Sequence, residues 1–148
     1  MTLNLSVFLD ASARSHPDRD AVVLGVQRLS YAEVNELACQ VAGLLVARGI
    51  RPGDKVALSC PNVPHFPVVY YGILKAGATV VPLNVLLKRR DIAYVLADSD
   101  AKAYFCFEGT PELPVGEEGH AGFRQADRCE SFFLITAEPS AASPIEMT

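Results

Sequence analysis

The sequence lacks the two features that would direct the protein into a membrane or out of the cell. It has no apolar run of about 18 residues, the minimum for a membrane span, so we expect no transmembrane segment. Residues 1–10 lack the basic start of a secretory signal, and Asp10 interrupts their short apolar run. Together these absences favour a protein of the cytoplasm.

Cysteine and histidine are few and scattered. The four cysteines form no CxxC pair, and the three histidines form no HxH or HxxxH pair. A zinc site needs ligands at closer spacing, so we expect no metal ion. In a chain without a secretory signal the cysteines are typical of free thiols. Cys60 and Cys106 lie in or beside apolar runs, where cysteine acts as a small hydrophobic residue.

Positive charge is not in excess. Lys and Arg number 13 against 17 Asp and Glu, and the net charge of −4 disfavours nonspecific binding of nucleic acid. Residues 1–106 carry 11 basic and 9 acidic groups, whereas residues 107–148 carry 2 and 8. We therefore predict an α/β core over residues 1–107 and an acidic, Pro/Gly-rich segment over residues 108–148. Within that segment we expect one strand at 131–136 and a loose end over 137–148.

The clearest element is a helix over residues 31–48, whose apolar side chains recur with a period of 3.6. Ser30 is a good N-cap, and Glu33 stands three residues later, which completes a capping box. Gly49 is expected to end the helix in a left-handed conformation, and Pro52 blocks its continuation.

Helices and strands alternate through the rest of the core. We expect a short helix before Pro17, a helix over 64–75 capped by Asn62, and a helix over 88–98. The expected strands are residues 21–24, 27–30, 55–59, 78–83 and 102–107, of which 78–83 resembles a parallel strand buried on both faces. This order predicts an α/β fold with a mainly parallel sheet flanked by helices.

Three adjacent cations are the candidate ligand-binding residues. Lys88, Arg89 and Arg90 follow the expected strand 78–83 at its carboxyl end, where open α/β sheets bind ligands. They can attract the phosphates of coenzyme A or a ligand carboxylate. The alternative is a solvated helix start with Asp91 as the ionic partner. We assign no catalytic residue.

Two adjacent tyrosines in the helix expected over 64–75 are a further candidate. Tyr70 and Tyr71 diverge by about 100° around the helix axis, so only one of them can line a given pocket. Packing in the core is the alternative role for both.

Several stretches resemble the N-terminal part of AMP-forming acyl-CoA synthetases, a branch of the adenylate-forming superfamily. They are LSYAEVNELACQVAGLLVARGIRPGDKVAL at 29–58, PN at 61–62, YYGILKAGATVVPLN at 70–84 and LKRRDIAYVLADSDAKA at 87–103. LKAGATVVPLN is the most specific of these motifs. The motif ends in Asn84, and in this it resembles acyl-CoA and aryl-CoA ligases. Peptide-synthetase domains usually carry Asp at this position. The resemblance implies the N-terminal subdomain of the adenylate-forming fold.

The sequence lacks the segments that carry the catalytic residues of this family. Family members are several times longer, and the phosphate loop of the form TSGTTGxPK, the magnesium-binding segment and the adenylating lysine are absent here. The glycine-containing loop at 108–122 carries four glutamates and lacks the positive charge that a phosphate site needs. We therefore expect no cofactor and no activity for this chain alone. ATP, magnesium and coenzyme A are implied for the whole enzyme.

We interpret the chain as the N-terminal fragment of an acyl-CoA synthetase, cut off before the phosphate loop, with a fatty acid as the expected substrate. The alternative is a self-sufficient, noncatalytic α/β module that associates with itself or with a partner chain. A flavodoxin-like ligand binder is a third hypothesis, against which LKAGATVVPLN argues. A homo-oligomer, the missing C-terminal part or residues 108–148 folded back onto the core are expected to cover apolar surface on residues 78–83 and 102–107.

Overall fold

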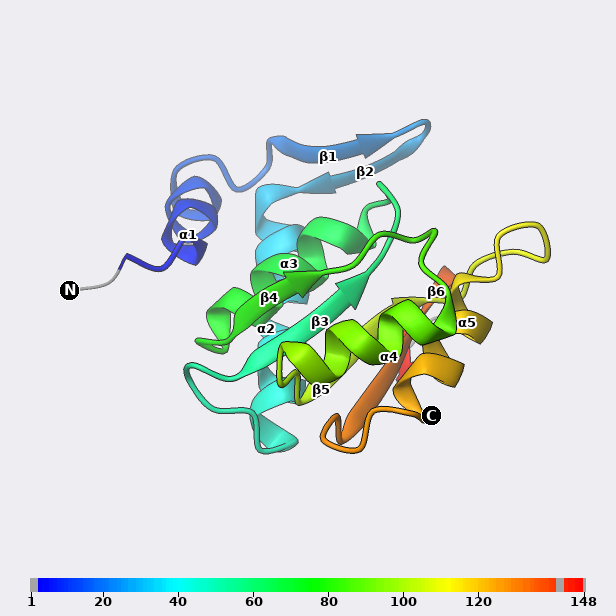
Figure 1. The fold of residues 1–148 in the computed structure, drawn as a ribbon. Coiled ribbons are helices and arrows are strands. Elements are labelled where there is room, and N and C mark those ends of the chain that lie inside the picture. The colour runs from blue at the N-terminus through cyan, green and yellow to red at the C-terminus, as the bar shows by residue number, and fades with distance from the viewer. Residues whose placement is uncertain (1–2, 141–142, 148) are drawn as a thin grey trace. The chain divides into compact units, whose positions relative to one another are not determined.

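The computed structural model describes residues 3–140 and 143–147. The helices are Ser6–Ser15 (α1), Tyr31–Ala47 (α2), His65–Lys75 (α3), Arg89–Asp98 (α4) and Val115–Phe123 (α5). The strands are Asp20–Leu24 (β1), Gln27–Ser30 (β2), Lys55–Ser59 (β3), Thr79–Pro82 (β4), Ala103–Phe107 (β5), Ser131–Ser140 (β6) and Ser143–Met147 (β7). Figure 1 follows these elements along the chain.

The chain forms two compact units, one of residues 1–53 and 62–79 and the other of residues 54–61 and 80–148. The limits of these units reflect which residues lie close together in space. The predicted boundary at Phe107 was based on charge and on Pro and Gly content, and it stays a prediction.

The first unit holds the hairpin β1–β2 and the helices α1, α2 and α3. The predicted capping box of α2 is confirmed: the Ser30 hydroxyl accepts from the Glu33 N–H, and the Glu33 carboxylate accepts from the Ser30 N–H. Helices α2 and α3 pack closely, because Gly72 faces Val41. A Cβ atom on Gly72 would lie 2.5 Å from the Val41 Cβ.

The end of α2 is a Schellman motif, as the sequence predicted. Gly49 has φ of +82°, its N–H donates to the Val46 carbonyl, and the Ile50 N–H donates to the Leu45 carbonyl. Ile50 is buried, so it supplies the hydrophobic contact that accompanies this motif.

Replacement of Gly49 by valine should lower the free energy of unfolding by about 1–2 kcal/mol, because a β-branched residue is strained in the left-handed region. Gly43, an exposed residue within α2, provides the control. Its replacement by alanine should raise stability by up to about 1 kcal/mol. Urea denaturation measures both variants, and a Gly49→Val protein as stable as the parent would contradict the left-handed helix end.

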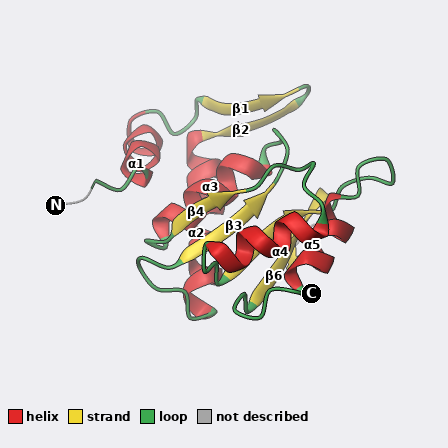
Figure 2. Cartoon of the chain, in the orientation of Figure 1, coloured by secondary structure: helices red, strands yellow, loops and turns green. Residues whose placement is uncertain are grey.

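The second unit is built on a sheet with the strand order β4-β3-β5-β6-β7. Strands β3, β5 and β6 are parallel, with Val56 opposite Ala103 and Ala103 opposite Ser131. Helices α4 and α5 lie along one face of this sheet (Figure 2). The predicted α/β class, with a mainly parallel sheet flanked by helices, is confirmed.

Aromatic side chains alternate between the two faces of the sheet. Tyr104 and Phe132 lie in the core cluster formed with α4 and α5, and their ring centroids are 5.5 Å apart. Phe105 and Phe133 point to the opposite face and stack at 4.7 Å, and both are fully buried. The runs at 102–107 and 131–136 are therefore interior. Of the expected ways to cover 102–107, the structure shows residues 108–148 folded back onto it.

Helix α5 occupies part of the segment 108–122 that the sequence predicted as a loop. Three of its nine residues are glycines, and each is buried: Gly116, Gly119 and Gly122. A Cβ on Gly119 would lie 2.3 Å from the Cys106 sulfur, and one on Gly122 would lie 2.7 Å from Ile92 Cγ2. The glycines therefore let α5 approach β5 and α4. Glycine has a low helix propensity, which hid the helix from sequence analysis.

Three further features of the fold differ from the predictions. Strand β4 lies at the edge of the described sheet, beside β3. Its end residues Thr79 and Pro82 are exposed and the two between them are only half-buried, so this strand is not buried on both faces. Helix α3 takes Pro64 as its N-cap without a side-chain bond, so the predicted cap by Asn62 is wrong. Strand β7, which pairs with β6, lies in the end expected to be loose, and Pro144 is compatible with its edge position.

Candidate functional site

The loops at the carboxyl edge of the sheet are the natural place for a ligand in this fold class. Because β3 and β5 are parallel, the residues after Ser59 and after Phe107 leave the sheet at the same edge. Residues 83–88 connect β4 to α4, and Lys88 is the N-cap residue of that helix. Lys88, Arg89 and Arg90 are all exposed there.

Arg89 is paired with Glu118 of α5. Its Nη2 lies 2.6 Å from Glu118 Oε1, its Nε donates to Oε2 over 3.2 Å, and Glu117 lies farther away at 3.7 Å. The backbone N–H of Arg89 also donates to Glu118 Oε2, over 2.8 Å. The Glu118 carboxylate thus caps the N-terminus of α4, which no side chain of α4 itself does.

This pairing changes what the three cations can do. The observed partner of Arg89 comes from α5 and not from Asp91, the partner that the structural alternative had suggested. Arg89 is therefore already engaged, and Lys88 and Arg90 flank it on the exposed start of α4. Binding of a phosphate or carboxylate by Lys88, Arg89 and Arg90 stays a prediction.

The same pairing makes stability depend on pH. Hydrogen bonds from the side chain and backbone of Arg89 lower the pKa of Glu118 from 4.5 to about 2. A carboxyl whose pKa is lower in the folded state stabilises the protein above its unfolded pKa, and this contribution is lost as the pH falls towards 2.

We expect Glu118→Gln to be less stable than the parent at pH 7, with the two urea midpoints converging between about pH 4.5 and 2. Glu112→Gln removes an exposed charge from the loop before α5 and serves as the control, whose midpoint should run parallel to that of the parent. A constant difference between Glu118→Gln and the parent down to pH 2 would contradict the pairing.

The loop before α5 uses its backbone groups internally. The Gly116 N–H donates to the Glu108 carbonyl over 3.0 Å, and the Glu108 carboxylate accepts from the Ala137 N–H over 2.7 Å. The first turn of α5 carries Glu117 and Glu118, so the protein's own carboxylates stand where a phosphate would need to bind. These described residues do not fit a nucleotide triphosphate.

The buried thiols are poor nucleophiles. Burial raises the pKa of Cys60 and Cys129 to about 12 and that of Cys106 to about 11, so these thiols stay protonated at neutral pH. Cys39 on α2 is exposed, and all four cysteines are free, as predicted. Among the described residues, no group of three or more His, Cys, Asp or Glu side chains is placed to hold a metal ion.

The motif LKAGATVVPLN holds elements together. Lys75 Nζ pairs with Asp10 of α1 at 2.5 Å, and the Asn4 amide donates to the Leu74 carbonyl at the end of α3. Gly77 has φ of +77° and lies against Pro52. Asn84 Oδ1 accepts from the Leu86 N–H in the turn after β4, which explains a short polar side chain there.

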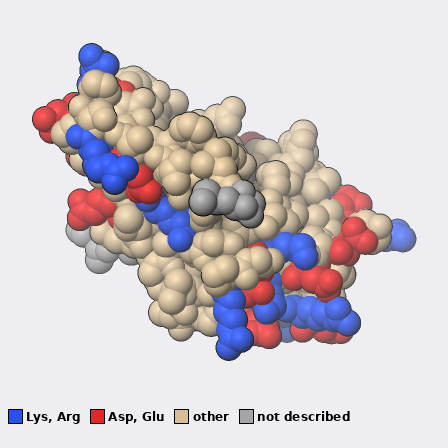
Figure 3. All heavy atoms as spheres, turned by 90° about the vertical axis from the view of Figure 1, so that its left-hand side faces the viewer, with Lys and Arg blue, Asp and Glu red and all other residues tan. Residues whose placement is uncertain are grey.

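Basic and acidic side chains of the described residues lie next to one another on the face shown in Figure 3. Such a mixed surface differs from the basic stripe that attracts nucleic acid. Within residues 3–140 and 143–147, none of the helices has the length and hydropathy to cross a membrane.

Known proteins with similar sequences are much longer. The family model for AMP-binding enzymes matches residues 9–143. Triostin synthetase I of Streptomyces triostinicus is 40% identical over 100 residues, which make up 68% of this chain and 19% of that protein. The long-chain-fatty-acid–CoA ligase FadD13 of Mycobacterium tuberculosis is 41% identical over 88 residues, or 60% of this chain and 17% of the ligase. The chain thus spans about a fifth of the length of these curated relatives.

A solved structure matches the fold over nearly the whole chain. The N-terminal domain of FACL13 from Mycobacterium tuberculosis superposes with a TM-score of 0.75 at 33% sequence identity. The match covers 92% of this chain and 34% of that domain.

Proposed function

Because the chain belongs to the family of AMP-binding enzymes, we propose that it is the N-terminal part of a cytoplasmic acyl-CoA ligase that acts on fatty acids. Such an enzyme joins a carboxylic acid to ATP, which gives an acyl-adenylate and pyrophosphate. It then transfers the acyl group to the thiol of coenzyme A and releases AMP. Family membership also rules out the flavodoxin-like hypothesis.

The observation that carries this proposal is the match of residues 9–143 to the family, together with the FACL13 N-terminal domain as a structural neighbour. The fatty acid is supported by the 41% identity to a long-chain-fatty-acid–CoA ligase. A triostin synthetase of almost equal identity supports only the wider family, so experiment must decide the substrate.

The contribution of this chain within such an enzyme is a scaffold. The glycine-containing loop at 108–122 carries carboxylates that would repel a triphosphate, so we expect ATP and magnesium to be held by parts of the enzyme outside this sequence. The exposed loops at the carboxyl edge, with Lys88 and Arg90, are the part of this chain that we expect to face a phosphate of coenzyme A or an acyl carboxylate.

The chain alone should therefore release no pyrophosphate from ATP. Phosphoryl chemistry requires positioned cations and N–H donors, which the described residues do not offer. The assay combines the purified chain with ATP, magnesium, coenzyme A and palmitate, and a heat-inactivated sample gives the background. Pyrophosphate release above that background would contradict the scaffold role.

A chimaera tests the role in the whole enzyme. The chain is joined to the part of FadD13 that follows the matched region, and AMP release with palmitate is measured. Activity that is lost when Gly119 is replaced by valine, a substitution expected to unfold the second unit, would support the proposal. An inactive but folded chimaera would favour the noncatalytic module instead.

The substrate requires the chain's own continuation. If genomic DNA downstream of Thr148 encodes a TSGTTG-type segment, the longer product can be assayed with palmitate, benzoate and oxalate. Preference for benzoate or oxalate would overturn the fatty acid and leave the role as an N-terminal part intact.

The noncatalytic module keeps one observation in its favour, the exposed apolar side chains of the first unit. Val26 at the hairpin tip is 98% exposed, and Phe8 on α1 is 57% exposed. We propose that this surface supports self-association, which light scattering after size-exclusion chromatography measures. A monomer that binds no apolar dye would remove this alternative.

A further inference from the structure

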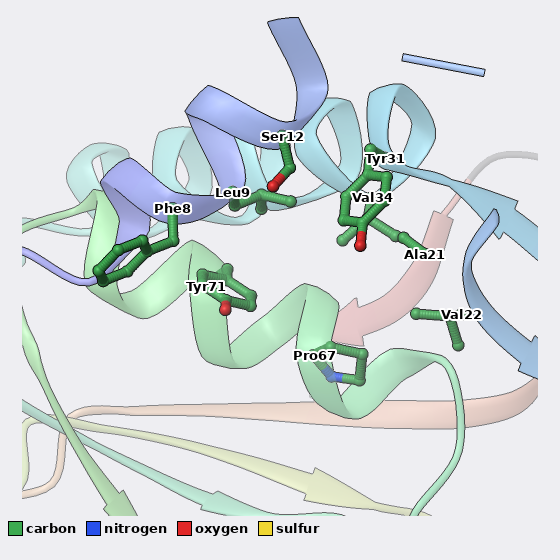
Figure 4. A pocket seen from close by; sticks show the side chains of 9 residues that line it. All are labelled: Phe8, Leu9, Ser12, Ala21, Val22, Tyr31, Val34, Pro67 and Tyr71. Carbon is green, nitrogen blue, oxygen red and sulfur yellow. The ribbon is translucent and has the colours of Figure 1, made fainter. Parts of the chain in front are cut away.

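The first unit has a pocket of about 300 Å³, partly open to solvent, between its helices and its hairpin (Figure 4). Four elements contribute side chains to it, namely α1, β1, α2 and α3. The lining residues are Phe8, Leu9, Ser12, Ala21, Val22, Tyr31, Val34, Pro67 and Tyr71. Of the two adjacent tyrosines, only Tyr71 lines this cavity, in agreement with the prediction that they point in different directions.

The wall combines apolar side chains with three hydroxyl groups and no charge. Leu9 and Val34 are almost fully buried and form its floor. The hydroxyls belong to Ser12, Tyr31 and Tyr71, and within the described residues none of them makes a hydrogen bond to another protein group. In Figure 4 the hydroxyls of Ser12 and Tyr31 point towards α3, which carries Tyr71.

We propose that this cavity binds a small, uncharged molecule that has an apolar body and one hydroxyl group, such as an alkylphenol. A hydroxyl both donates and accepts hydrogen bonds, which suits the three free hydroxyls of the wall. A charged ligand would lose part of its hydration without gaining a counter-charge, because the lining contains no Asp, Glu, Lys, Arg or His side chain.

The size of the cavity suits one substituted ring. An engineered apolar cavity of about 150 Å³ binds benzene, and this cavity has about twice that volume. An alkylphenol fills it and places its single polar group within reach of Ser12, Tyr31 or Tyr71, whereas a long acyl chain exceeds it.

The site is separate from the proposed acyl-CoA ligase chemistry. The acids that such enzymes activate are carboxylates at neutral pH, whereas this wall selects against charge. All nine lining residues also belong to the first unit, whereas the candidate cations Lys88 and Arg90 belong to the second. Binding here is therefore measurable without any enzymatic activity.

The test uses 4-ethylphenol and its charged counterpart 4-ethylbenzoate on the full chain. We expect 4-ethylphenol to raise the melting temperature in a concentration-dependent way, since it binds only the folded state. It should also shift amide resonances of α1, α2 and α3 in NMR spectra. We expect 4-ethylbenzoate to do neither at the same concentration.

Matched variants locate the binding. Tyr31→Phe and Tyr71→Phe should each lower the affinity for 4-ethylphenol by about 3- to 10-fold, which corresponds to the loss of one hydrogen bond. Tyr70→Phe on the same helix as Tyr71 should leave affinity unchanged. Ala21→Leu should abolish binding by filling the cavity, whereas Val23→Leu, on the same strand but exposed, should not.

The control variants make the proposal falsifiable even if one substitution disturbs the fold. Circular dichroism and the melting temperature without ligand show that each variant is folded. Failure of 4-ethylphenol to bind the parent chain would overturn the proposal, as would equal binding of 4-ethylbenzoate. Equal losses from Tyr70→Phe and Tyr71→Phe would also overturn it.

Discussion

Replacement of Gly119 by valine should unfold the second unit. The Cβ of any larger residue at this position would lie 2.3 Å from the Cys106 sulfur and 3.0 Å from the Tyr104 hydroxyl, both inside the core. Overpacking a well-packed core costs about 1–3 kcal/mol and sometimes more, and the two branches of valine add to it. We expect a loss of about 3 kcal/mol or more in the free energy of unfolding, measured by urea denaturation.

A double-mutant cycle separates this clash from a change in helix propensity. Gly119→Ala places the same Cβ against Cys106 but improves helix propensity by about 1 kcal/mol. In the background of Cys106→Ala the sulfur is gone, so Gly119→Ala should cost less there by at least about 1 kcal/mol. Equal costs in both backgrounds would show that α5 does not approach β5 as closely as described.

Phe133→Ala should cost about 3–5 kcal/mol, the range for a large buried aromatic residue. The ring is fully buried and stacks on Phe105, its neighbour on β5, at 4.7 Å. The truncation therefore removes a stacking contact and leaves a cavity in the sheet's core. Thermal and urea unfolding measure the loss, which is large compared with the total stability of an average domain.

Phe8→Ala is the matched control, because the Phe8 ring is 57% exposed. Its truncation should cost no more than about 1 kcal/mol. A similar result for Phe8 and Phe133 would contradict the position of β6 in the core. It would also restore the interpretation of residues 108–148 as a loose surface segment.

The sequence predicted the elements whose signals are local. Helix α2 has its N-cap at Ser30, its box partner at Glu33 and its left-handed end at Gly49 within one continuous stretch. Capping and apolar periodicity are short-range properties, so a single sequence contains them in full. The helix predicted over 64–75 was found at His65–Lys75 for a similar reason, since Pro67 is then in the first turn, where proline is tolerated.

Helix α5 could not be predicted because its signal is tertiary. Its buried residues are Val115 and the glycines Gly116, Gly119 and Gly122, so a single apolar side chain marks the buried face and gives no apolar periodicity. The reason for these glycines is the proximity of Cys106 and Ile92, which are distant in sequence. Propensity alone therefore favoured a loop, and packing against β5 and α4 reversed it.

The candidate site shows the same limit. The cations at 88–90 were visible as a cluster, but the partner of Arg89 stands 29 residues away in a segment predicted to be a loop. An ion pair between two helices depends on how they pack, and no spacing rule within one helix anticipates it. The expectation that the four glutamates of residues 108–122 disfavour a phosphate stays a prediction, and the ion pair between Arg89 and Glu118 was not foreseen.

The interleaving of the two units has a consequence for synthesis on the ribosome. Strand β3 belongs to the second unit, yet it lies in the sequence between α2 and α3 of the first. When translation has reached Lys75, the three helices and the hairpin have been made, but no strand that pairs with β3 has been made. The apolar stretch Val-Ala-Leu at 56–58 then has unpaired edges, a state that invites aggregation. Strand β3 can therefore enter its sheet only after the chain has been extended through β4 and β5.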